Sequence, residues 1–205
     1  MNKGEEYRVD EINSRHEDRE HMRKCLITNN CWGFMLYREY NMRYESPTIS
    51  MQIPGEVFWK FCKDLRYYLE SELVEYQKLT SEHERYVKHL YGEIPNYPIG
   101  RIDDVVIVFQ HYATFEDAKA KWDRRKARVD FDNVAYLFTA FNETYSDSVG
   151  RFLDLKLPHS VAVTEGFSYP GACRYDIPEG CDGFSRVNGR RVIEDNFSVA
   201  EWLEI

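Results

Sequence analysis

The chain has 205 residues, of which 43% are hydrophobic and 15% aromatic, and its formal net charge is −8 at pH 7. This composition is typical of a folded globular protein and excludes collagen-like and intrinsically disordered chains. The negative charge argues against a general nucleic-acid binder, because such proteins need excess Lys and Arg to displace counterions from phosphates. The length suits one domain that buries its own core.

The sequence also lacks the signals of membrane insertion and secretion. No apolar run is long enough to span a bilayer, and residues 1–24 mix acidic and basic side chains without the apolar core of a signal peptide. The five cysteines are irregularly spaced, as expected of free thiols in a reducing compartment. We therefore expect a cytoplasmic protein with a charged tail over residues 1–24 and a single α/β domain over residues 25–205.

The first predicted strand covers residues 25–28 and leads through the turn NNCWG into a helical pattern at residues 34–40. A second strand is predicted over residues 46–53, which contain β-branched side chains. Pro54 then starts an amphipathic helix of about twenty residues. Its apolar stripe comprises Phe58, Phe61, Cys62, Leu65, Leu69 and Leu73.

The middle of the chain contains one ambiguous region and one clear strand. Residues 75–97 fit two interpretations, a helix that begins at Ser81 and stops at Gly92, or an edge strand over residues 74–79. The sequence leaves both open. The continuous apolar run at residues 104–109 predicts a central parallel strand that is covered on both faces.

Strands and helices alternate in the second half. Thr114 starts a predicted helix that extends to about Arg128. Strands are predicted over residues 134–141 and 160–164 with a short helix between them, and Asn188-Gly189 predicts a hairpin turn before a last short helix. This order predicts a three-layer α/β fold, with a mostly parallel, Rossmann-like sheet, helices on both faces and an irregular C-terminal hairpin extension.

Four polar residues follow predicted strand ends, namely Cys31, His111, Asn142 and Glu165. Parallel strands present their carboxyl ends at one edge of a sheet, where open α/β folds bind ligands, so we expect these side chains to converge. Cys31 also precedes a helix, whose N-terminus favours a thiolate.

This arrangement predicts nucleophilic chemistry. Cys31 is the candidate nucleophile and His111 the candidate acid/base, while Asn29 and Asn30 are candidate donors to an oxyanion or a substrate. The alternative is structural, with Cys31 packed under Trp32 and His111 hydrogen-bonded at a strand end. Sequence spacing does not decide between the two.

Residues 119–128, KAKWDRRKAR, concentrate positive charge in an otherwise acidic protein. Lys121, Arg124 and Arg125 are candidates to hold a phosphate, because arginine offers a bidentate fork to such groups. A basic helical run is also typical of a solvated helix face. We expect Trp122, on the same helix, to pack in the hydrophobic core of the protein rather than to stack on a ligand.

Asp130 and Asp132 have the spacing of the paired acids that hold a divalent ion in many glycosyltransferases, and Asn133 is adjacent. Turn formation explains Asp132-Asn133 equally well. Cys173 and Cys181 lack the paired spacing of a zinc site. We therefore assign no metal site.

Several separated motifs occur in order: NNCWG at residues 29–33, SPT at 46–48, YPIG at 97–100, HY at 111–112, and Trp122 through Arg125 to Asp132-Asn133. With these motifs the chain over residues 26–163 resembles a bacterial family of domains of unknown function, often described as exopolysaccharide or capsular polysaccharide biosynthesis proteins. Phe34 stands where that family often has a second glycine, and Asp130 stands where asparagine is common. The second departure weakens the paired-acid interpretation.

The asparagine-cysteine pair after the first strand is also similar to the start of a polysaccharide-associated family of cysteine-based acyltransferases that bind coenzyme A. That similarity covers only Asn30, Cys31 and their neighbours. It implies that a thiol at this position takes part in acyl transfer.

Together these expectations describe a transferase of bacterial exopolysaccharide or capsular polysaccharide synthesis, which performs cysteine-assisted acyl transfer to a sugar. The activated donor would be acyl-coenzyme A or a nucleotide sugar, and no nucleic-acid partner is expected. Two alternatives stay open, a nucleotide-sugar glycosyltransferase that uses Asp130 and Asp132, and a non-catalytic partner in a polysaccharide-assembly complex. The predicted substrate-binding residues are Asn29, Asn30, Trp32, Tyr112, Lys121, Arg124, Arg125, Asp132 and Asn133.

Overall fold

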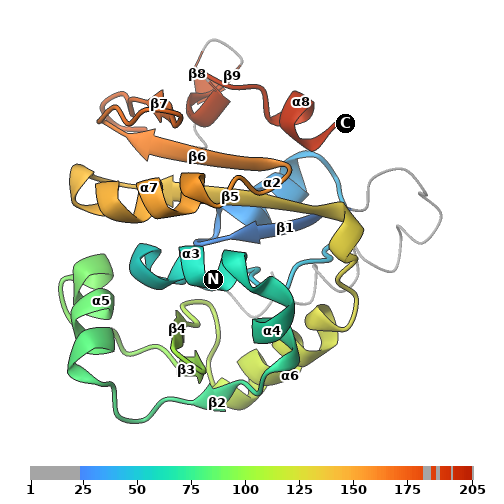
Figure 1. Cartoon of the computed structure of the whole chain (residues 1–205), viewed down its shortest axis with the longest axis vertical. Coiled ribbons are helices and arrows are strands. Elements are labelled where there is room, and N and C mark those ends of the chain that lie inside the picture. Colours follow the sequence, from blue (N-terminus) through green and yellow to red (C-terminus); the bar gives the residue numbers. More distant parts are fainter. Residues whose placement is uncertain (1–23, 182–185, 188–189, 195, 205) are drawn as a thin grey trace.

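The computed structural model describes residues 24–181, 186–187, 190–194 and 196–204. Their strands form a four-stranded sheet, a three-stranded sheet and a two-stranded hairpin, with helices packed around the two larger sheets (Figure 1). Apart from Lys24, the predicted charged tail lies outside the described residues. None of the described helices has both the length and the apolar character needed to cross a membrane.

The four-stranded sheet is parallel throughout, with the strand order β1-β5-β6-β7. Its interior strand β5 is buried along its whole length, as expected of an apolar run between two parallel neighbours. The mixed α/β class and the three predicted strands of this sheet are confirmed. The bounds are Cys25–Thr28 for β1, Val134–Ala140 for β5, Ser160–Glu165 for β6 and Cys173–Tyr175 for β7.

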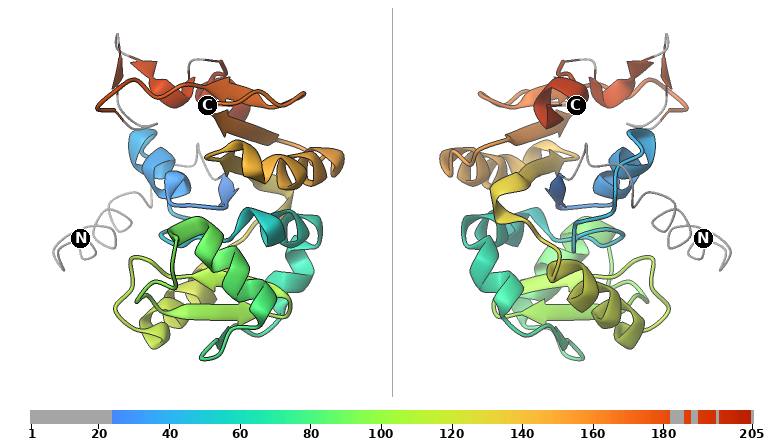
Figure 2. Two further views of the ribbon diagram at one scale, coloured as in Figure 1. Left: turned by 90° about the vertical axis from the view of Figure 1, so that its left-hand side faces the viewer. Right: turned by 90° about the vertical axis from the view of Figure 1, so that its right-hand side faces the viewer.

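Alternate residues of β5 belong to two hydrophobic cores. Phe138 packs against Phe58 and Phe152, with ring centroids 5.7 and 5.4 Å away, whereas its neighbour Leu137 shares a second core with Leu36. Helices α2 and α8 contribute to the second core, whereas α3 and α7 contribute to the first. Figure 2 shows α2 and α7 on opposite sides of the sheet. The bounds of the helices that form these cores are Trp32–Glu39 for α2, Gly55–Lys63 for α3, Ser146–Asp154 for α7 and Val199–Leu203 for α8.

The apolar run at residues 104–109 is not a central parallel strand, so that prediction is wrong. It forms β4 (Val105–Val108), which pairs antiparallel with β3 (Ile99–Ile102), and β3 pairs antiparallel with β2 (Val74–Glu75). Only two residues separate β3 from β4. Such a connection permits a hairpin, whereas parallel neighbours need a crossover of roughly a dozen residues or more. All of β4 is buried because it lies inside the core that also covers one face of the parallel sheet.

The strand predicted over residues 46–53 is also wrong. These residues form successive turns and one isolated bridge from Gln52 to β4. Thr48 Oγ1 accepts a hydrogen bond from the backbone N–H of Thr28 at 3.1 Å, and Ser46 Oγ lies 3.0 Å from the same hydroxyl. Side chains that hydrogen-bond to backbone in this way compete with strand pairing, so β-branched residues are buried here without a strand.

The amphipathic helix predicted after Pro54 is interrupted at Asp64, which leaves the helical region with φ −123° and ψ 45°. The two resulting helices are α3 and α4 (Leu65–Glu70), and the predicted apolar stripe is buried along both. Cys62 lies within this buried stripe, as expected.

Both interpretations of residues 75–97 hold in part. The short strand β2 precedes α5 (Ser81–Tyr91), which ends at Gly92 with a φ of +79°. The N-cap of α5 is Thr80, whose Oγ1 accepts a hydrogen bond from the backbone N–H of His83 at 3.2 Å. The helix therefore begins as the pattern predicts, with the capping hydroxyl one residue earlier.

The remaining elements follow the predicted order. Thr114 caps α6 and so starts the predicted basic helix, and a hairpin and a last helix complete the C-terminal part. The turn of that hairpin, Asn188-Gly189, lies outside the described residues. The bounds are Phe115–Lys126 for α6, Phe131–Asn133 for η1, Glu143–Tyr145 for η2, Arg186–Val187 for β8, Arg190–Arg191 for β9 and Val192–Glu194 for η3.

Candidate functional site

The carboxyl ends of β1, β5 and β6 lie at one edge of the parallel sheet, because the three strands run in the same direction (Figure 1). Cys31 follows β1, Asn142 follows β5, and Glu165 ends β6. His111 instead follows β4 of the antiparallel sheet. Topology therefore brings three of the four predicted residues to this edge, and His111 reaches it from the other sheet.

Asn29 is a structural residue at this edge. Its Nδ2 donates to the backbone carbonyl of Thr139 at 2.9 Å, and its Oδ1 accepts from the backbone N–H of the same residue at 2.9 Å. The side chain is 97% buried, with an exposed fraction of 3%. The amide thus extends the pairing of β1 with β5, and its predicted role as a substrate or oxyanion donor is not supported by the geometry.

Asn30 and Trp32 shape the start of α2. Asn30 Oδ1 accepts from the backbone N–H of Trp32 at 2.9 Å, while Asn30 Nδ2 is buried without a hydrogen-bond partner among the described residues. The Trp32 ring packs against Phe141 and Tyr175 with centroids 6.3 and 5.4 Å away. Trp32 is therefore a core residue and offers little surface to a substrate.

Glu165, the fourth residue predicted to converge, is engaged with this aromatic cluster. Its Oε2 accepts a hydrogen bond from the Tyr175 hydroxyl at 3.0 Å. Burial, followed by the adjacent Glu165 charge, raises the pKa of Tyr175. The pair ties the end of β6 to β7.

The thiol of Cys31 and the imidazole of His111 share a neighbour, the side-chain amide of Gln110. Gln110 Nε2 lies 2.9 Å from His111 Nε2, and a hydrogen bond from the Gln110 side chain favours the Cys31 thiolate. The Tyr91 hydroxyl lies 3.0 Å from Gln110 Oε1 and 3.1 Å from Gln52 Oε1, and its one proton is shared between these two acceptors. These side chains form one polar cluster between the two sheets.

The electrostatics of this cluster do not support the predicted thiolate. Burial raises the pKa of Cys31 and outweighs the favourable hydrogen bonds, so the resting sulfur is a neutral thiol near pH 7. Burial lowers the pKa of His111, whose neutral imidazole can accept a proton. The sequence pattern could not reveal this, because desolvation depends on the residues that cover the thiol.

A carboxylate, an imidazole and a hydroxyl are aligned close to the end of β5. His89 Nδ1 lies 2.6 Å from Glu56 Oε1, and His89 Nε2 lies 2.6 Å from Thr144 Oγ1. The Tyr145 ring stacks on the imidazole with centroids 4.3 Å apart and an interplanar angle of 13°. Asn142 Oδ1 accepts hydrogen bonds from the Thr144 backbone N–H, at 3.0 Å, and from its hydroxyl.

Each member of this relay comes from a different element. Glu56 lies in the first turn of α3, His89 in the last turn of α5, and Thr144 in η2, which directly follows β5. The side chains of Glu56 and His89 are 20% and 31% exposed, so the relay is held by packing and remains partly exposed to solvent. A hydroxyl and a carboxylate on the two nitrogens of one imidazole form the arrangement of nucleophile, base and orienting acid.

Sequence reasoning missed this relay. Its one usable signal was Asn142 at the end of a predicted strand, because Thr144 follows two residues later. His89 lies in the region that the sequence left ambiguous, and Glu56 looks like an ordinary acidic residue in a first helical turn. The three meet only through tertiary contacts.

Of the three basic residues of α6 that were predicted to bind an anion, Arg125 is buried, whereas Lys121 and Arg124 are partly or fully exposed. Arg125 is 6% exposed, and its Nη1 donates to the backbone carbonyl of Ile49 at 3.2 Å and to the Tyr112 hydroxyl at 2.8 Å. Arg125 and Tyr112 therefore stabilise the turns of residues 46–53, which contain Ile49. Lys121 is half-buried and Arg124 is exposed on the same helix.

Asp130, Asp132 and Asn133 form a turn rather than a convergent ligand set. Asp130 Oδ1 accepts from the backbone N–H of Asp132 at 3.1 Å, which caps η1. Within the described part of the chain, no group of three or more His, Cys, Asp and Glu side chains is placed to hold a metal ion.

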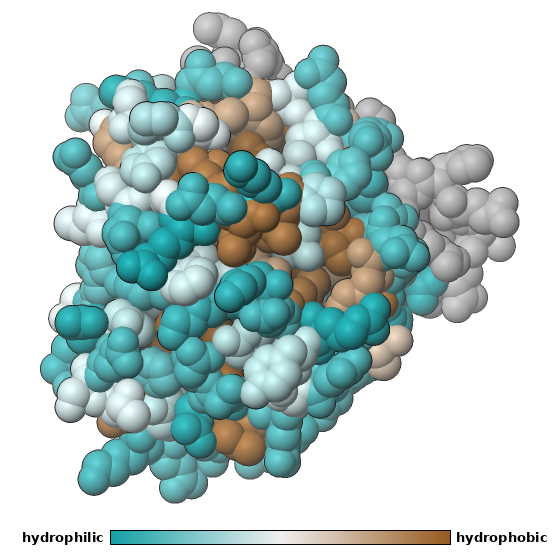
Figure 3. Space-filling model, in the orientation of Figure 1, coloured by the Kyte–Doolittle hydropathy of each residue, from teal (hydrophilic) through white to brown (hydrophobic). Residues whose placement is uncertain are grey.

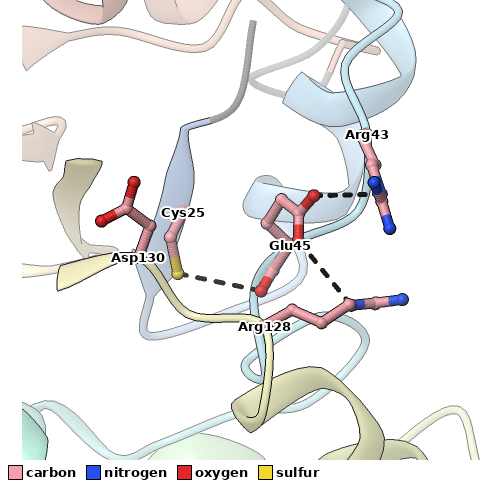
Figure 4. A pocket seen from close by; sticks show the side chains of 5 residues that line it. All are labelled: Cys25, Arg43, Glu45, Arg128 and Asp130. Atoms are coloured by element: carbon pink, nitrogen blue, oxygen red, sulfur yellow. Dashed lines mark hydrogen bonds and ion pairs between the residues drawn. The ribbon is translucent and has the colours of Figure 1, made fainter. Parts of the chain in front are cut away.

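A cavity of about 260 Å³ lies at the opposite, amino edge of the parallel sheet, where β1 and β5 begin (Figure 4). Its Glu45 carboxylate is 9% exposed and forms ion pairs with Arg43 Nε at 3.0 Å and Arg128 Nε at 3.7 Å. The Cys25 thiol donates to the Glu45 backbone carbonyl at 3.9 Å, and burial raises the pKa of that thiol. The lining residues are Cys25, Arg43, Glu45, Arg128 and Asp130.

Comparison with known proteins identifies the family. Residues 2–171 match the model of the Domain of unknown function (DUF1919). The chain is also 22% identical over 187 residues to an uncharacterized protein of Haemophilus influenzae (strain ATCC 51907 / DSM 11121 / KW20 / Rd), an alignment that covers 87% of this chain and 82% of that protein. The expectation of a bacterial domain family of unknown function is confirmed, and the chain belongs to the DUF1919 family.

Proposed function

We propose that the protein is a transferase of bacterial surface-polysaccharide synthesis that moves an acyl group onto a sugar hydroxyl. The observation that carries the proposal is the relay of Glu56, His89 and Thr144, in which both imidazole nitrogens lie 2.6 Å from an oxygen. A hydroxyl nucleophile, a base and an orienting carboxylate are the parts that covalent acyl transfer requires.

In the first half-reaction, Thr144 Oγ1 attacks the carbonyl carbon of an activated acyl donor, such as a thioester of coenzyme A. The Thr144 hydroxyl first turns from Asn142 Oδ1 to His89 Nε2 and gives its proton to that nitrogen. Glu56 stabilises the resulting imidazolium through Nδ1–H. The carbon–sulfur bond then breaks, and the leaving thiolate takes the proton from Nε2. The acyl group is left as an ester on Thr144.

In the second half-reaction, a sugar hydroxyl attacks the Thr144 ester and gives its proton to His89 Nε2. The ester bond to Thr144 breaks, and the same proton returns to Oγ1. The products are the acylated sugar and the original enzyme. Because His89 serves as base and then as acid in each half, a single imidazole suffices for both.

The assignment to polysaccharide synthesis rests on the resemblance described under the sequence analysis. The matching family model describes only a domain of unknown function. The alternative of a nucleotide-sugar glycosyltransferase has less support, since Asp130 is occupied in capping η1. A non-catalytic role in an assembly complex would leave the Glu56–His89–Thr144 alignment as a purely structural link between α3, α5 and η2.

Cys31 is the second candidate nucleophile, as the sequence predicts. Its support is the Gln110 amide, which contacts both the thiol and His111. The raised pKa of Cys31 counts against it, because the thiol would have to lose its proton to a base that lies one amide group away.

The test is turnover of acyl-coenzyme A donors with sugar acceptors, after a thermal-shift screen identifies donors that bind the folded protein. His89→Gln should lower kcat by about 10²- to 10⁴-fold, because it removes the general base. Thr144→Val removes the hydroxyl at nearly constant shape and should also abolish turnover, while Thr144→Ser should retain it. The matched control is His159→Gln, since His159 is another half-exposed histidine beside a carboxylate, 3.8 Å from Glu204.

Three results would contradict the proposal. Wild-type rates in His89→Gln, with turnover lost in Cys31→Ala, would assign the reaction to Cys31 instead. Binding of nucleotide sugars alone, with sugar transfer as the measured reaction, would favour the glycosyltransferase. A wild-type protein that neither binds nor turns over any donor of either class would favour the non-catalytic role.

A further inference from the structure

The amino-edge cavity contains two arginines that are held by one buried carboxylate. Glu45 Oε1 and Oε2 each face the Nε atom of a different guanidinium, that of Arg43 at 3.0 Å and that of Arg128 at 3.7 Å. Arg128 is fixed further by its Nη2, which donates to the backbone carbonyl of Tyr44 at 2.7 Å. The two forks are therefore positioned before any ligand arrives.

The outer nitrogens of these guanidinium groups are only partly used. The Nη atoms of Arg43 have no hydrogen-bond or ion-pair partner among the described residues, and Arg128 Nε is buried without a hydrogen bond there. Figure 4 shows both guanidinium groups on the side of Glu45 that faces away from Cys25 and Asp130. Guanidinium groups from two separate segments of the chain, one after α2 and one after α6, thus lie on the same side of Glu45.

Positive charge accumulates around this point of an acidic protein. Burial lowers the pKa of Arg128, and the nearby charges of Arg43, Arg125 and Arg124 lower it further, while Glu45 opposes them. The cavity lining itself holds two carboxylates, Glu45 and Asp130, beside its two guanidinium groups, and the charges of Arg124 and Arg125 lie nearby. An added anion would relieve this repulsion and would replace the hydration that the arginines lose.

We propose that this cavity binds a phosphate or diphosphate group between Arg43 and Arg128. Arg43 can offer its two Nη atoms to such a group as a bidentate fork, and Arg128, whose Nε and Nη2 are already engaged, can offer its Nη1. Charge-assisted hydrogen bonds of this kind are the strong ones. The volume of about 260 Å³ is several times the roughly 30 Å³ that one water occupies in the liquid, so a diphosphate fits. The ligand is either free pyrophosphate or the diphosphate end of a larger molecule.

This site is separate from the proposed catalytic relay. Cys25 and Asp130 stand at the amino ends of β1 and β5, whereas Thr144 follows the carboxyl end of β5. Binding here can therefore be measured without any reference to turnover. The proposal stands or falls independently of the function assigned to Glu56, His89 and Thr144.

The experiment is calorimetric titration of the full chain with inorganic phosphate, pyrophosphate and uridine diphosphate at constant ionic strength. Wild-type protein should bind pyrophosphate more tightly than phosphate, because a diphosphate can contact both guanidinium groups at once, whereas a single phosphate group cannot reach both equally well. Arg43→Gln should weaken pyrophosphate binding by roughly tenfold or more, since it removes charge-assisted hydrogen bonds. Arg43→Lys keeps the positive charge but lacks the guanidinium fork, so its affinity for pyrophosphate should lie between those of the wild type and Arg43→Gln.

Arg151→Gln is the matched control. Arg151 is also an arginine paired with a carboxylate, Asp147 at 2.8 Å, but it lies on the surface of α7. This variant should bind pyrophosphate as the wild type does. Tighter binding of uridine diphosphate than of pyrophosphate identifies a larger ligand, and equal binding identifies the diphosphate alone.

The proposal is overturned if wild-type protein binds none of the three anions, or if Arg43→Gln and Arg151→Gln bind pyrophosphate equally. Circular dichroism of each variant verifies that it is folded. If Arg43→Gln does not fold, Arg43→Lys carries the test, and an unchanged pyrophosphate affinity in that variant likewise overturns the bidentate site.

Discussion

At the scale of single residues, Arg125 shows how a candidate ligand-binding side chain can instead serve the fold. It is 6% exposed, and the two acceptors of its Nη1 are the neutral oxygens of Ile49 and Tyr112. A buried cation requires such partners, because an unpaired charge in the interior is strongly destabilising. The arginine and the tyrosine therefore stabilise the turn that contains Ile49.

Tyr112→Phe tests this role. We expect the free energy of unfolding to fall by about 1–3 kcal/mol, because the substitution removes an acceptor from a buried guanidinium. Denaturant titration measures the change. The control is Tyr67→Phe, whose hydroxyl donates to Asp103 on a side chain that is 53% exposed, so its loss should stay within about 0.5 kcal/mol. Equal losses in the two variants would contradict a structural role for Tyr112.

The identity of a residue predicted which functional group it carries, but it did not predict whether that group is exposed to a substrate. Asn29, Arg125 and Trp32 have the functional groups that the sequence assigned to substrate binding, yet each is buried and engaged in the fold. The same holds for Cys31, whose predicted thiolate is opposed by burial. Whether a polar side chain reaches solvent depends on residues distant in sequence, which spacing along the chain does not encode.

At the scale of elements, α5 is the helix that positions the proposed relay. It carries His89 in its last turn and ends at Tyr91, which binds Gln52 and Gln110. Figure 3 shows that hydrophobic residues reach the surface near the middle of one face of the molecule, surrounded by hydrophilic residues. α5 packs Val87 into the core with Leu90 partly buried beside it, and its N-cap and the hydrogen bonds of Tyr91 add polar contacts to this burial.

Thr80→Ala tests the dependence of the relay on α5. Loss of the N-cap hydroxyl should cost about 1 kcal/mol of stability and should also reduce turnover, because the helix that holds His89 is weakened. Thr114→Ala is the matched control, since Thr114 Oγ1 caps α6 by the same hydrogen bond at 3.1 Å. It should lose similar stability with turnover unchanged. A turnover loss in Thr114→Ala alone would contradict the role of α5.

Element signals that are local in sequence were reliable for some elements and failed at residues 46–53, which form turns instead of the predicted strand. The Thr114 cap and the helical spacing after it predicted α6, and the apolar run after Asn133 predicted β5. The apolar run of β4 was equally clear as a strand, but its neighbours were predicted wrongly. An apolar run reports burial on both faces, and a hairpin inside a core satisfies that condition as well as a parallel sheet does.

At the scale of the whole molecule, the two sheets share one hydrophobic core. Phe138 of β5, Val106 of β4 and Phe61 of α3 all belong to it, and Phe61 packs on Trp122 of α6 with centroids 6.2 Å apart. Such continuity favours cooperative folding of both sheets together. The second core, on the other face of β5, is joined to the first through that strand.

We therefore expect a single unfolding transition. Far-UV circular dichroism and tryptophan fluorescence should report the same denaturant midpoint, and the calorimetric and van't Hoff enthalpies should agree. Two separate midpoints would mean that the antiparallel sheet unfolds independently, in contradiction to the single domain predicted over residues 25–205.

The sequence by itself determined the α/β class, three of the four strands of the parallel sheet and the helices with caps and apolar stripes, because these depend on neighbours within a few residues. It did not predict β7. Only the tertiary structure decided which strand β4 pairs with and which polar side chains meet. His89 lies 33 positions from Glu56 and 55 from Thr144 along the chain. Contacts over such separations are set by how helices and sheets pack around a shared core, and no local pattern records that packing.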